Sequence, residues 1–552
     1  MKKLLLILFF GACFVGHSFS QVKVTLSKPY RVVDGSFKQY IQKGDELLKV
    51  TLDGKLVIIQ KFDTKALTET SKKEYEDLTK GFSFEEIVEL NDRFYFFYSV
   101  WDKPNETEQL FCREIDFKSG VLLAKEIAIL KVQGKVTGSR AGLGLSMFSF
   151  GVTNKFDFQT NSDQTSLLIK YRKKPLEKKD SKNFDVIGFY VYTTDLSKPL
   201  WSKEHTMPFT EALMDNLDYS VDKSGNAYLL AAVFDQEAKS RDDVSFHLEL
   251  FQVNAKTTKL AGSKIDFEGK SVNKIWVYEN PKGFMMCAGF YSNDKKYSAD
   301  AKGIFAFKID AAGKIYDKAT YDIPLEIINM YASKRQKEKN DKKDDAGELE
   351  FADLILRSIT FQEDGSLVLF GEQHYIDMQS SGIPLMPYYT LSDGTRVYQK
   401  YCFSCNTTRY QYKYNDMLVT KIDANGKLAW MKKLPKRQMG LTGQGGMGYY
   451  STSFEGKHYL LFLDNVKNVN IGKDEVPALH QDGRGGFLTS YTIDDKTGAV
   501  SKASLFDSRN VEGTEIFQFD VDRIRQISGS EFVLEAYKKG KEDILIKVNL
   551  KK

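Results

Sequence analysis

Apolar and polar residues alternate in short runs along most of this chain, and many of the apolar positions are aromatic or β-branched. A period of two predicts β-strands rather than helices. Seven runs open a recurring unit in which a polar loop follows and a second alternating run ends in Ile-Asp or a close equivalent. The opening runs are 94–101, 166–171, 228–234, 284–290, 366–370, 459–463 and 532–537.

The end of each unit predicts a tight reversal into a further strand. Asp310 and Asp423 close their runs, and Gly313 and Gly426 follow shortly after. Asx side chains bond the backbone ahead of them, and glycine accepts a positive φ, so such corners favour hairpins. Repeated hairpins at this spacing predict an all-β fold, a β-propeller of seven blades.

The two ends of the chain bear on the blade count. The last unit stops after its third strand, and the runs 46–52 and 56–62 have no complete unit of their own. We therefore expect an N-terminal strand to complete the last blade, which removes exposed sheet edges. Eight blades are the alternative if residues 37–62 form one by themselves. Two or three separate β-sandwich domains are a further alternative, but no proline- or serine-rich linker divides the chain.

Two insertions depart from the repeat. Residues 324–357 carry Ile327, Ile328 and Tyr331 at helical spacing with mixed charges, which predicts a short, solvated helix. Residues 375–415 form a long loop rich in tyrosine. Because tyrosine joins a rigid apolar face to a polar tip, we expect this loop to bind a ligand. The alternative is that its rings only pack over the edge of the blade. Its candidate binding residues are Tyr388, Tyr389, Tyr398, Tyr401, Arg409, Tyr410 and Tyr412.

The N-terminus reads as a secretory signal peptide over residues 1–20. Lys2 and Lys3 precede the apolar stretch 4–10, and small residues at Ser18 and Ser20 precede Gln21. Export to the periplasm or outer surface of a Gram-negative bacterium is therefore expected, with a single propeller domain over 21–552. A lipoprotein acylated on Cys13 is the less favoured alternative.

Composition excludes some classes of partner. The chain is 13% aromatic and 28% charged, which argues against disorder. Its net charge is only +5 with no clustered basic stretch, so nucleic acid is not an expected partner. No apolar stretch approaches the ~20 residues of a transmembrane helix. We expect no cofactor.

The cysteines suggest structural roles. Cys112 and Cys287 lie within apolar runs and are expected to be buried. Cys402 and Cys405 form a CxxC pair without a second pair or nearby histidines, so a zinc site is not expected. In an exported protein we expect this pair to form a local disulfide.

Two glycine-rich segments predict loops. Residues 443–448 match GxGxxG, but the residues that follow read as a strand rather than the helix that a dinucleotide site requires. Gly483, Gly485 and Gly486 suggest a second loop, which could lie near the first at one face of the propeller.

The candidates for catalysis are weak. Known hydrolase and phosphate-loop motifs are absent. Asp102, Asp235, Glu372 and Asp464 follow apolar runs, and two of them converging at the channel mouth could act as acid and as base or nucleophile. Glu372 and His374 share one face of a strand, which suits acid-base chemistry or simply a hydrogen-bonded pair. The scattered histidines predict no metal site, although one assembled by the fold is a third possibility.

The chain resembles the secreted bacterial propeller proteins of unknown activity. The resemblance rests on the corners 308–313 and 421–426 and on the strand 367–371. It implies binding or scaffolding outside the cytoplasm and carries over no catalytic residue. We therefore expect a non-enzymatic envelope protein that recognises a protein or glycan through loops on one face. The alternative is a carbohydrate-active hydrolase or lyase using channel-mouth carboxylates.

Overall fold

A computed structural model of the whole chain provides the fold. The structure describes residues 22–137, 155–173, 182–237, 244–265, 267, 269–293, 299–310, 312–382, 388–390, 396–398, 406–441, 446–483 and 485–550. The predicted signal peptide, with Cys13, lies outside these residues.

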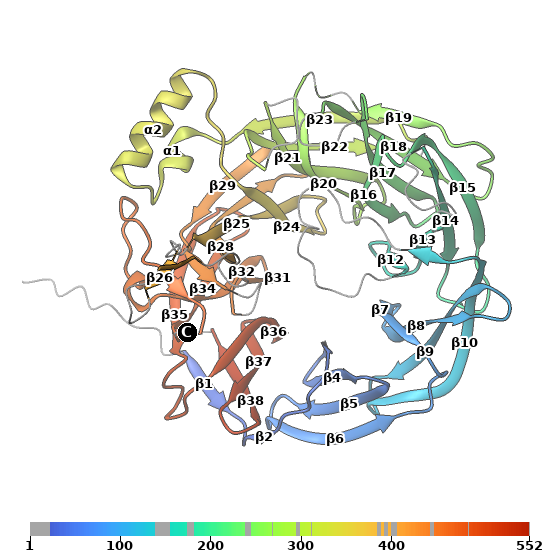
Figure 1. Ribbon diagram of the computed structural model, residues 1–552, viewed down its shortest axis with the longest axis horizontal. Helices are drawn as coiled ribbons and strands as arrows, with labels where there is room; N and C mark the ends of the chain where they lie inside the picture. Colours follow the sequence, from blue (N-terminus) through green and yellow to red (C-terminus); the bar gives the residue numbers. More distant parts are fainter. Residues whose placement is uncertain are drawn as a thin grey trace, which may run out of the picture.

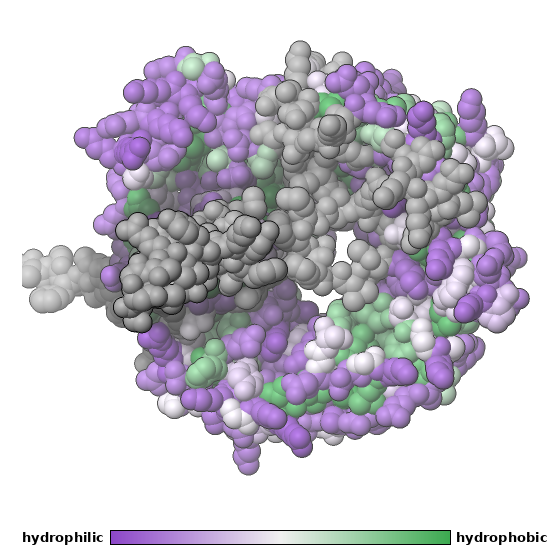
Figure 2. Space-filling view, in the orientation of Figure 1, coloured by the Kyte–Doolittle hydropathy of each residue, from purple (hydrophilic) through white to green (hydrophobic). Residues whose placement is uncertain are grey.

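The described strands form nine sheets, and eight of them, with almost entirely antiparallel pairing, are arranged as the blades of a closed propeller around a central channel (Figure 1). An opening through the centre of the ring is visible in the space-filling view (Figure 2). Each blade has its first strand at the channel and its last strand at the rim. The fold class predicted from the sequence is confirmed.

Blades 1 to 4 follow one another along the chain. Blade 1 is β3 (Phe37–Lys43), β4 (Glu46–Asp53), β5 (Leu56–Asp63) and β6 (Thr68–Tyr75), and blade 2 is β7 (Ser83–Leu90), β8 (Arg93–Asp102), β9 (Thr107–Asp116) and β10 (Val121–Gln133). Blade 3 is β11 (Val136–Thr137) with β12 (Asp157–Thr160), β13 (Leu167–Lys173), β14 (Phe184–Tyr192) and β15 (Trp201–Thr210). Blade 4 is β16 (Met214–Val221), β17 (Ala227–Phe234), β18 (Phe246–Val253) and β19 (Gly262–Ile265).

Blades 5 to 8 carry the additions to the repeat. Blade 5 is β20 (Ser271–Glu279), β21 (Met285–Ser292), β22 (Gly303–Ile309) and β23 (Ile315–Asp322), followed by α1 (Leu325–Asn329) and α2 (Lys334–Asp345). Blade 6 is β24 (Leu354–Phe361), β25 (Leu367–Gly382), β28 (Asn406–Ile422) and β29 (Leu428–Leu434), with β30 (Gln438–Gly440) and β33 (His480–Gln481) added. Blade 7 is β31 (Tyr450–Phe454), β32 (Lys457–Asp464), β34 (Phe487–Asp494) and β35 (Val500–Asp507), with the 3₁₀ turn η3 (Val466–Asn468) after β32. Blade 8 is β36 (Gln518–Ser528), β37 (Glu531–Lys538), β38 (Glu542–Asn549) and β1 (Lys23–Leu26), and β2 (Tyr30–Arg31) also pairs with β38.

The preferred count of seven blades was one too few. All seven opening runs are second strands of blades, but β4 and β5 belong to an eighth unit of their own, the alternative that the sequence left open. This unit is hard to recognise because its last strand, β6, is almost wholly polar and exposed. An N-terminal strand does complete the last blade, but that strand is β1, paired with β38 from Lys23↔Asn549 to Leu26↔Ile546.

The core lies between neighbouring blades rather than inside any one of them. The second strands are apolar on both faces, and every residue of β17 is buried. One face of β17 packs on blade 5 and the other on blade 3. Cys287 lies in the first of these clusters and Cys112 between blades 2 and 3, and both are free and buried as expected.

The ring closes through a buried polar cluster between blades 8 and 1. Glu535 accepts hydrogen bonds from the hydroxyls of Tyr30 and Tyr40, each at 2.5 Å, and pairs with Lys49 at 2.7 Å. Burial opposes ionisation of Glu535, but Lys49 and these hydrogen bonds hold the pKa of the carboxyl below its ordinary value. Since Tyr30 precedes blade 1 and Glu535 lies in blade 8, this cluster ties the N-terminal segment to the end of the chain.

The strand directions divide the connections between two faces. Turns from first to second and from third to fourth strands lie on one face, here called the short-turn face, and residues 44–45, 91–92 and 423–427 are examples. Connections from second to third strands, and from blade to blade, lie on the other, here called the loop face. The loop face receives α1 and α2, the far ends of β25 and β28, and residues 465–483 and 485–486.

Candidate functional site

The helical insertion is fastened to blade 6 at the loop face (Figure 1). Ser333 caps α2 by accepting a hydrogen bond from the backbone N–H of Gln336. The buried ammonium of Lys433, on β29, donates to the carbonyls of Ile328 at 2.9 Å and Met330 at 2.7 Å. A lysine at the last carbonyls of α1 satisfies acceptors that the helix leaves open. The outward side of the insertion is hydrophilic (Figure 2).

The predicted tyrosine-rich loop is largely a β-hairpin. β25 and β28 remain paired from Leu367↔Ile422 to Gly382↔Asn406, well beyond the ends of the neighbouring strands. Tyr410 pairs with Met378 and Tyr412 with Ile376, so both lie on an ordered strand. This part of the insertion is therefore strand rather than loop, because alternating aromatic residues pair well across a ladder.

For the other predicted binding residues the structure describes the backbone pairing, or they lie outside the described residues. Tyr388 and Tyr389 lie on β26 (Tyr388–Thr390), which pairs with β27 (Arg396–Tyr398), where Tyr398 lies opposite Tyr388. The backbone of Arg409 pairs with Gln379 on β25. Tyr401, Cys402 and Cys405 lie outside the described residues, so the disulfide stays a prediction.

A cavity of about 390 Å³ lies between the helical insertion and the root of this hairpin, and we call it the helix–hairpin cavity. Its walls come from α1 and α2, the start of blade 6, and residues 476–477. The lining combines aromatic rings with charges of both signs. The lining residues include Tyr331, Phe351, Asp353, Tyr375, Asp416, Lys433, Lys436 and Arg437.

Two residues of this lining have unusual backbone conformations. Tyr331 has φ +59° and Asp353 has φ +53°, in the left-handed region that side chains disfavour. The backbone N–H of Tyr331 donates to the carbonyl of Lys473 at 2.8 Å, so a contact from blade 7 holds it there. Such strain persists only where the surroundings impose it, and it is often found at binding sites.

Two ionisable groups of the cavity, Asp353 and Lys436, have shifted pKa values. Burial, with Asp300 and Asp377 nearby, raises the pKa of Asp353 to about 6. Burial lowers the pKa of Lys436, although Glu372 opposes this shift. The Lys436 ammonium also donates to the carbonyl of Tyr414 at 3.0 Å and to the Gln438 side chain at 3.1 Å. The cavity thus holds fixed charges in a partly desolvated space.

Glu372 lies directly behind this cavity, fully buried on β25. It pairs with Lys436 at 2.6 Å, and the Arg357 side chain donates to it at 2.5 Å. Burial opposes ionisation, but Arg357 and Lys436 together hold the pKa of Glu372 below its ordinary value. A carboxylate locked between two cations supports the fold rather than general acid-base catalysis.

His374 is likewise held by its neighbours. A β-bulge between Glu372 and His374 interrupts the pairing with β28, so the two do not continue a regular strand face. The Nδ1–H of His374 donates to the carbonyl of Lys413 at 2.9 Å, and the ring stacks on Tyr414 at 4.3 Å. Burial and the Arg357 charge lower the pKa of His374, which favours the neutral ring.

The remaining carboxylates lie apart from one another. Asp102 is in blade 2, across the ring from Glu372 in blade 6 (Figure 1), and accepts hydrogen bonds from Asn105 and Gln109. Asp464, in blade 7, pairs with Lys502 at 2.9 Å and accepts from Asn468. Asp235, in blade 4, lies 3.9 Å from His247. These contacts give each acid a partner, and catalysis by any of them stays a prediction.

A further acidic cluster lines the channel and was not predicted. Burial, with Asp157 and Glu85 beside it, raises the pKa of Glu86 to about 7. Asp157 pairs with Lys170 at 3.1 Å. Glu85 lies at a β-bulge in β7, and a similar bulge places Arg357 in β24. An extra residue in a first strand changes the face to which the neighbouring side chains point. The alternation of apolar and polar residues in the sequence does not show this change, so these residues were missed.

The described residues contain no group of three or more His, Cys, Asp or Glu side chains that could hold a metal ion. No helix in the same part of the chain is long and apolar enough to cross a membrane.

No protein-family model matches the sequence, and neither does any curated protein. Solved structures with similar folds include the β-propeller domain of the Trilobed protease from Pyrococcus furiosus, at 10% identity over 78% of this chain and 90% of that chain, with a TM-score of 0.32. An α-L-arabinanase of Penicillium chrysogenum matches at 11% identity over 63% and 94%, with a TM-score of 0.31. An uncharacterized protein of Listeria monocytogenes EGD-e matches at 8% identity over 94% and 97%, with a TM-score of 0.33. The likeness concerns the propeller fold and extends to no activity.

Proposed function

We propose that this protein is an exported binding or scaffold protein of the bacterial envelope, which recognises its partner through the loop face. The observation that carries the proposal is that, in the part of the chain that the structure describes, the large additions to the repeat gather on that face. The helical insertion, the extended hairpin and residues 465–483 and 485–486 lie there. Insertions that a fold does not need are commonly functional.

The helix–hairpin cavity is the proposed centre of this recognition. Half-buried Tyr331 and Tyr375 line it together with the buried Lys433, the exposed Arg437 and the carboxyl of Asp353. Aromatic and arginine side chains are the residue types that contribute most to protein interfaces. Because charges of both signs line the cavity, a segment of an envelope protein fits it better than a neutral glycan.

The alternative of a carbohydrate-active hydrolase or lyase has no comparable support. It requires two convergent carboxylates with one free to act on a substrate. Glu372 and Asp464 are each bound to cations, and Asp102 lies across the ring from Glu372. We therefore favour binding without catalysis.

Two alanines allow a matched test. Ala332 lines the helix–hairpin cavity, whereas Ala312 is exposed in a tight turn of the short-turn face. Immobilised mature protein is incubated with solubilised envelope of the native cell. We expect a partner that is retained by the unchanged protein and by Ala312→Trp, and lost with Ala332→Trp, which fills the cavity.

The proposal would be contradicted if both tryptophan variants lost the partner equally, or if both retained it. Thermal unfolding of both variants establishes that each is folded. If Ala332→Trp does not fold, Tyr375→Ala provides a second test, because it removes a ring from the same cavity without adding volume.

A further inference from the structure

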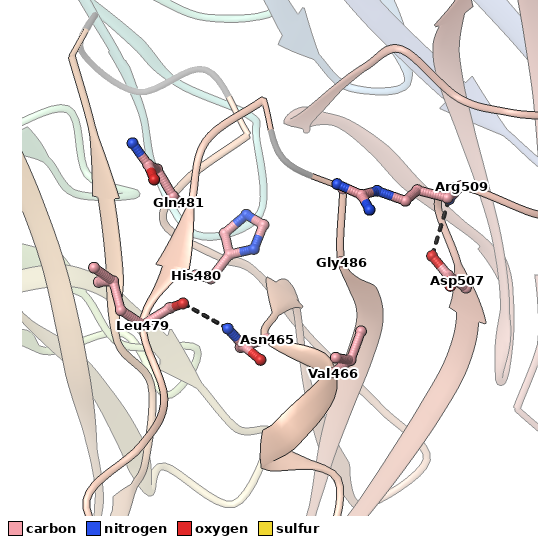
Figure 3. Close-up of a pocket in the computed structure, with 9 residues that line it drawn as sticks. Asn465, Val466, Leu479, His480, Gln481, Gly486, Asp507 and Arg509 are labelled. Carbon is pink, nitrogen blue, oxygen red and sulfur yellow. Dashed lines mark hydrogen bonds between the residues drawn. The ribbon is translucent and has the colours of Figure 1, made fainter.

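A second cavity, of about 310 Å³, lies on the loop face of blade 7 (Figure 3). Residues 476–481 run between the two cavities: Val476 and Pro477 line the helix–hairpin cavity, and Leu479, His480 and Gln481 line this one. We call it the blade-7 cavity. Its opposite wall is formed by Gly485, Gly486, Asp507 and Arg509.

Two glycines allow polar side chains to reach this cavity. A Cβ on Gly485 would lie 2.5 Å from Nε of Arg509. A Cβ on Gly486 would lie 3.0 Å from Nδ1 of His480 and 2.6 Å from a backbone oxygen. Because both positions are glycine, an arginine and a histidine can lie directly against the backbone of the loop. The loop also meets the other glycine-rich segment, as expected, since a Cβ on Gly446 would lie 3.1 Å from Asp482.

His480 lies in the cavity wall with an unsatisfied nitrogen. It is only 3% exposed, and its Nε2 has no hydrogen-bond partner among the described residues. Its backbone is fixed, because its N–H donates to the carbonyl of Arg437 and β33 pairs with β30. Burial lowers the pKa of the ring, while Asp464 and Asp482 oppose the shift and Lys436 adds to it. A neutral imidazole offers one donor and one acceptor, and buried polar atoms usually have partners.

The rest of the lining also mixes donors with acceptors. Gln481 supplies an amide, Arg509 supplies N–H donors, and Val466 adds an apolar surface that is 49% exposed. Asp507 supplies a carboxylate, one oxygen of which accepts from the backbone N–H of Arg509 at 2.9 Å. The Asn465 amide is already bonded to the carbonyl of Leu479 and to the N–H of Lys467. Arg509 and Asp507 offset one another in charge. Asp464, near His480, is paired with Lys502, so Asp482 is the additional carboxylate that disfavours an anion, and the polar side chains disfavour an apolar ligand.

We propose that the blade-7 cavity binds one neutral sugar unit, whose hydroxyls bond to His480, Gln481, Asp507 and Arg509 and whose C–H face packs on Val466. Hydroxyl groups both donate and accept, which matches a lining of alternating donors and acceptors. The cavity is of the size of the smaller ligand sites, which begin at about 300 Å³. This site is separate from the helix–hairpin cavity and does not depend on the function proposed there.

The test measures the NMR signal of the His480 ring while sugars are added. Mature protein carrying ¹³C-labelled histidine is titrated with glucose, galactose, mannose and N-acetylglucosamine at about 10 mM, ten times a Kd of about 1 mM. The ring signal of His480 is assigned with His480→Gln. We expect a saturable shift of this signal with at least one of the sugars, and no shift of His205, which lies in blade 3.

The loop offers a matched pair of variants for this titration. Gly485 and Gly483 have φ of +70° and +73°, so alanine strains the backbone equally at both. Only at Gly485 would the new Cβ meet Arg509, since nothing lies within 4 Å of one at Gly483. We expect Gly485→Ala to weaken the sugar about tenfold and Gly483→Ala to leave its affinity within about twofold.

Four outcomes would overturn the proposal: no shift with any of the four sugars, a shift with sodium phosphate instead, a shift that does not saturate, or equal weakening by both glycine variants. Titration with a polysaccharide that contains the responding sugar tests whether the ligand is a free sugar or a sugar unit of a glycan. Retention of the envelope partner by Gly485→Ala separates this site from the helix–hairpin cavity.

Discussion

On the short-turn face, side chains at the chain reversals are occupied in holding those reversals, while on the loop face the chain adds segments that the blades do not need. Asp423 shows the first case, since its carboxylate accepts from the N–H groups of Asn425 and Lys427 at 2.9 and 2.8 Å, and Gly426 follows with φ +80°. The helix–hairpin cavity shows the second. The comparison suggests that closure of the blades constrains one face and leaves the other available for recognition.

The largest expected effect concerns the buried charges beneath each face. Glu372→Ala removes the partner of Lys436 and Arg357 below the loop face, and we expect a loss of about 3–5 kcal/mol in the free energy of unfolding. Asp495 pairs with Lys421 at 2.5 Å at the short-turn face but is less buried, so Asp495→Ala is expected to lose about 1–3 kcal/mol. Urea unfolding measures both. A smaller loss at Glu372 than at Asp495 would contradict this order.

The channel between the faces gives the next prediction, which concerns pH. The folded protein raises the pKa of Glu86 above its unfolded value to about 7, so stability present below pH 4.5 is lost as the pH rises through about 7. Glu86→Gln cannot ionise, and at pH 8 we expect it to be more stable than the unchanged protein by about 2–3 kcal/mol. At pH 4.5 the difference should be much smaller.

Denaturant unfolding at the two pH values measures this difference. Glu69→Gln, at an exposed position of β6, is the control and should change stability little at either pH. A difference for Glu86→Gln that is the same at both pH values would show that ionisation is not its cause.

Substitution in a single turn of the short-turn face is expected to change the free energy of unfolding by a smaller amount. Asp423→Ala removes two hydrogen bonds to backbone N–H groups and should cost about 1–2 kcal/mol. Asp423→Asn keeps a side-chain acceptor and should cost clearly less. Thermal unfolding distinguishes the two, and an equal cost for both would show that the acceptor does not hold the turn.

The smallest effect is expected at the helical insertion. Ser333→Ala removes the cap of α2 and should cost about 0.5–1 kcal/mol locally. Because α2 is an addition to the propeller, we expect faster amide hydrogen exchange in 334–345 and an unchanged global unfolding midpoint. A fall in the global midpoint with no change in that exchange would contradict the separation of loop-face segments from the ring.

Much of the fold could be predicted because the second strands of seven blades are buried on both sides and read as apolar runs. Blade 1 was left incomplete because β6 is almost wholly polar. Less of the candidate site could be predicted from the sequence. Tyr410 and Tyr412 were found as aromatic residues in an insertion, but Arg357 and Glu86 lie at or beside bulges, and Asp353 and Tyr331 depend on backbone angles that sequence does not display.

Photo-crosslinking would show whether the loop face binds the partner. A benzoylphenylalanine is placed at Val476, which is 45% exposed beside the helix–hairpin cavity, or at Ala312 on the short-turn face, in cells of native type. We expect one discrete adduct at Val476, lost when Ala332→Trp is added, and none at Ala312. An adduct at Ala312 that Ala332→Trp leaves intact, with none at Val476, would contradict it.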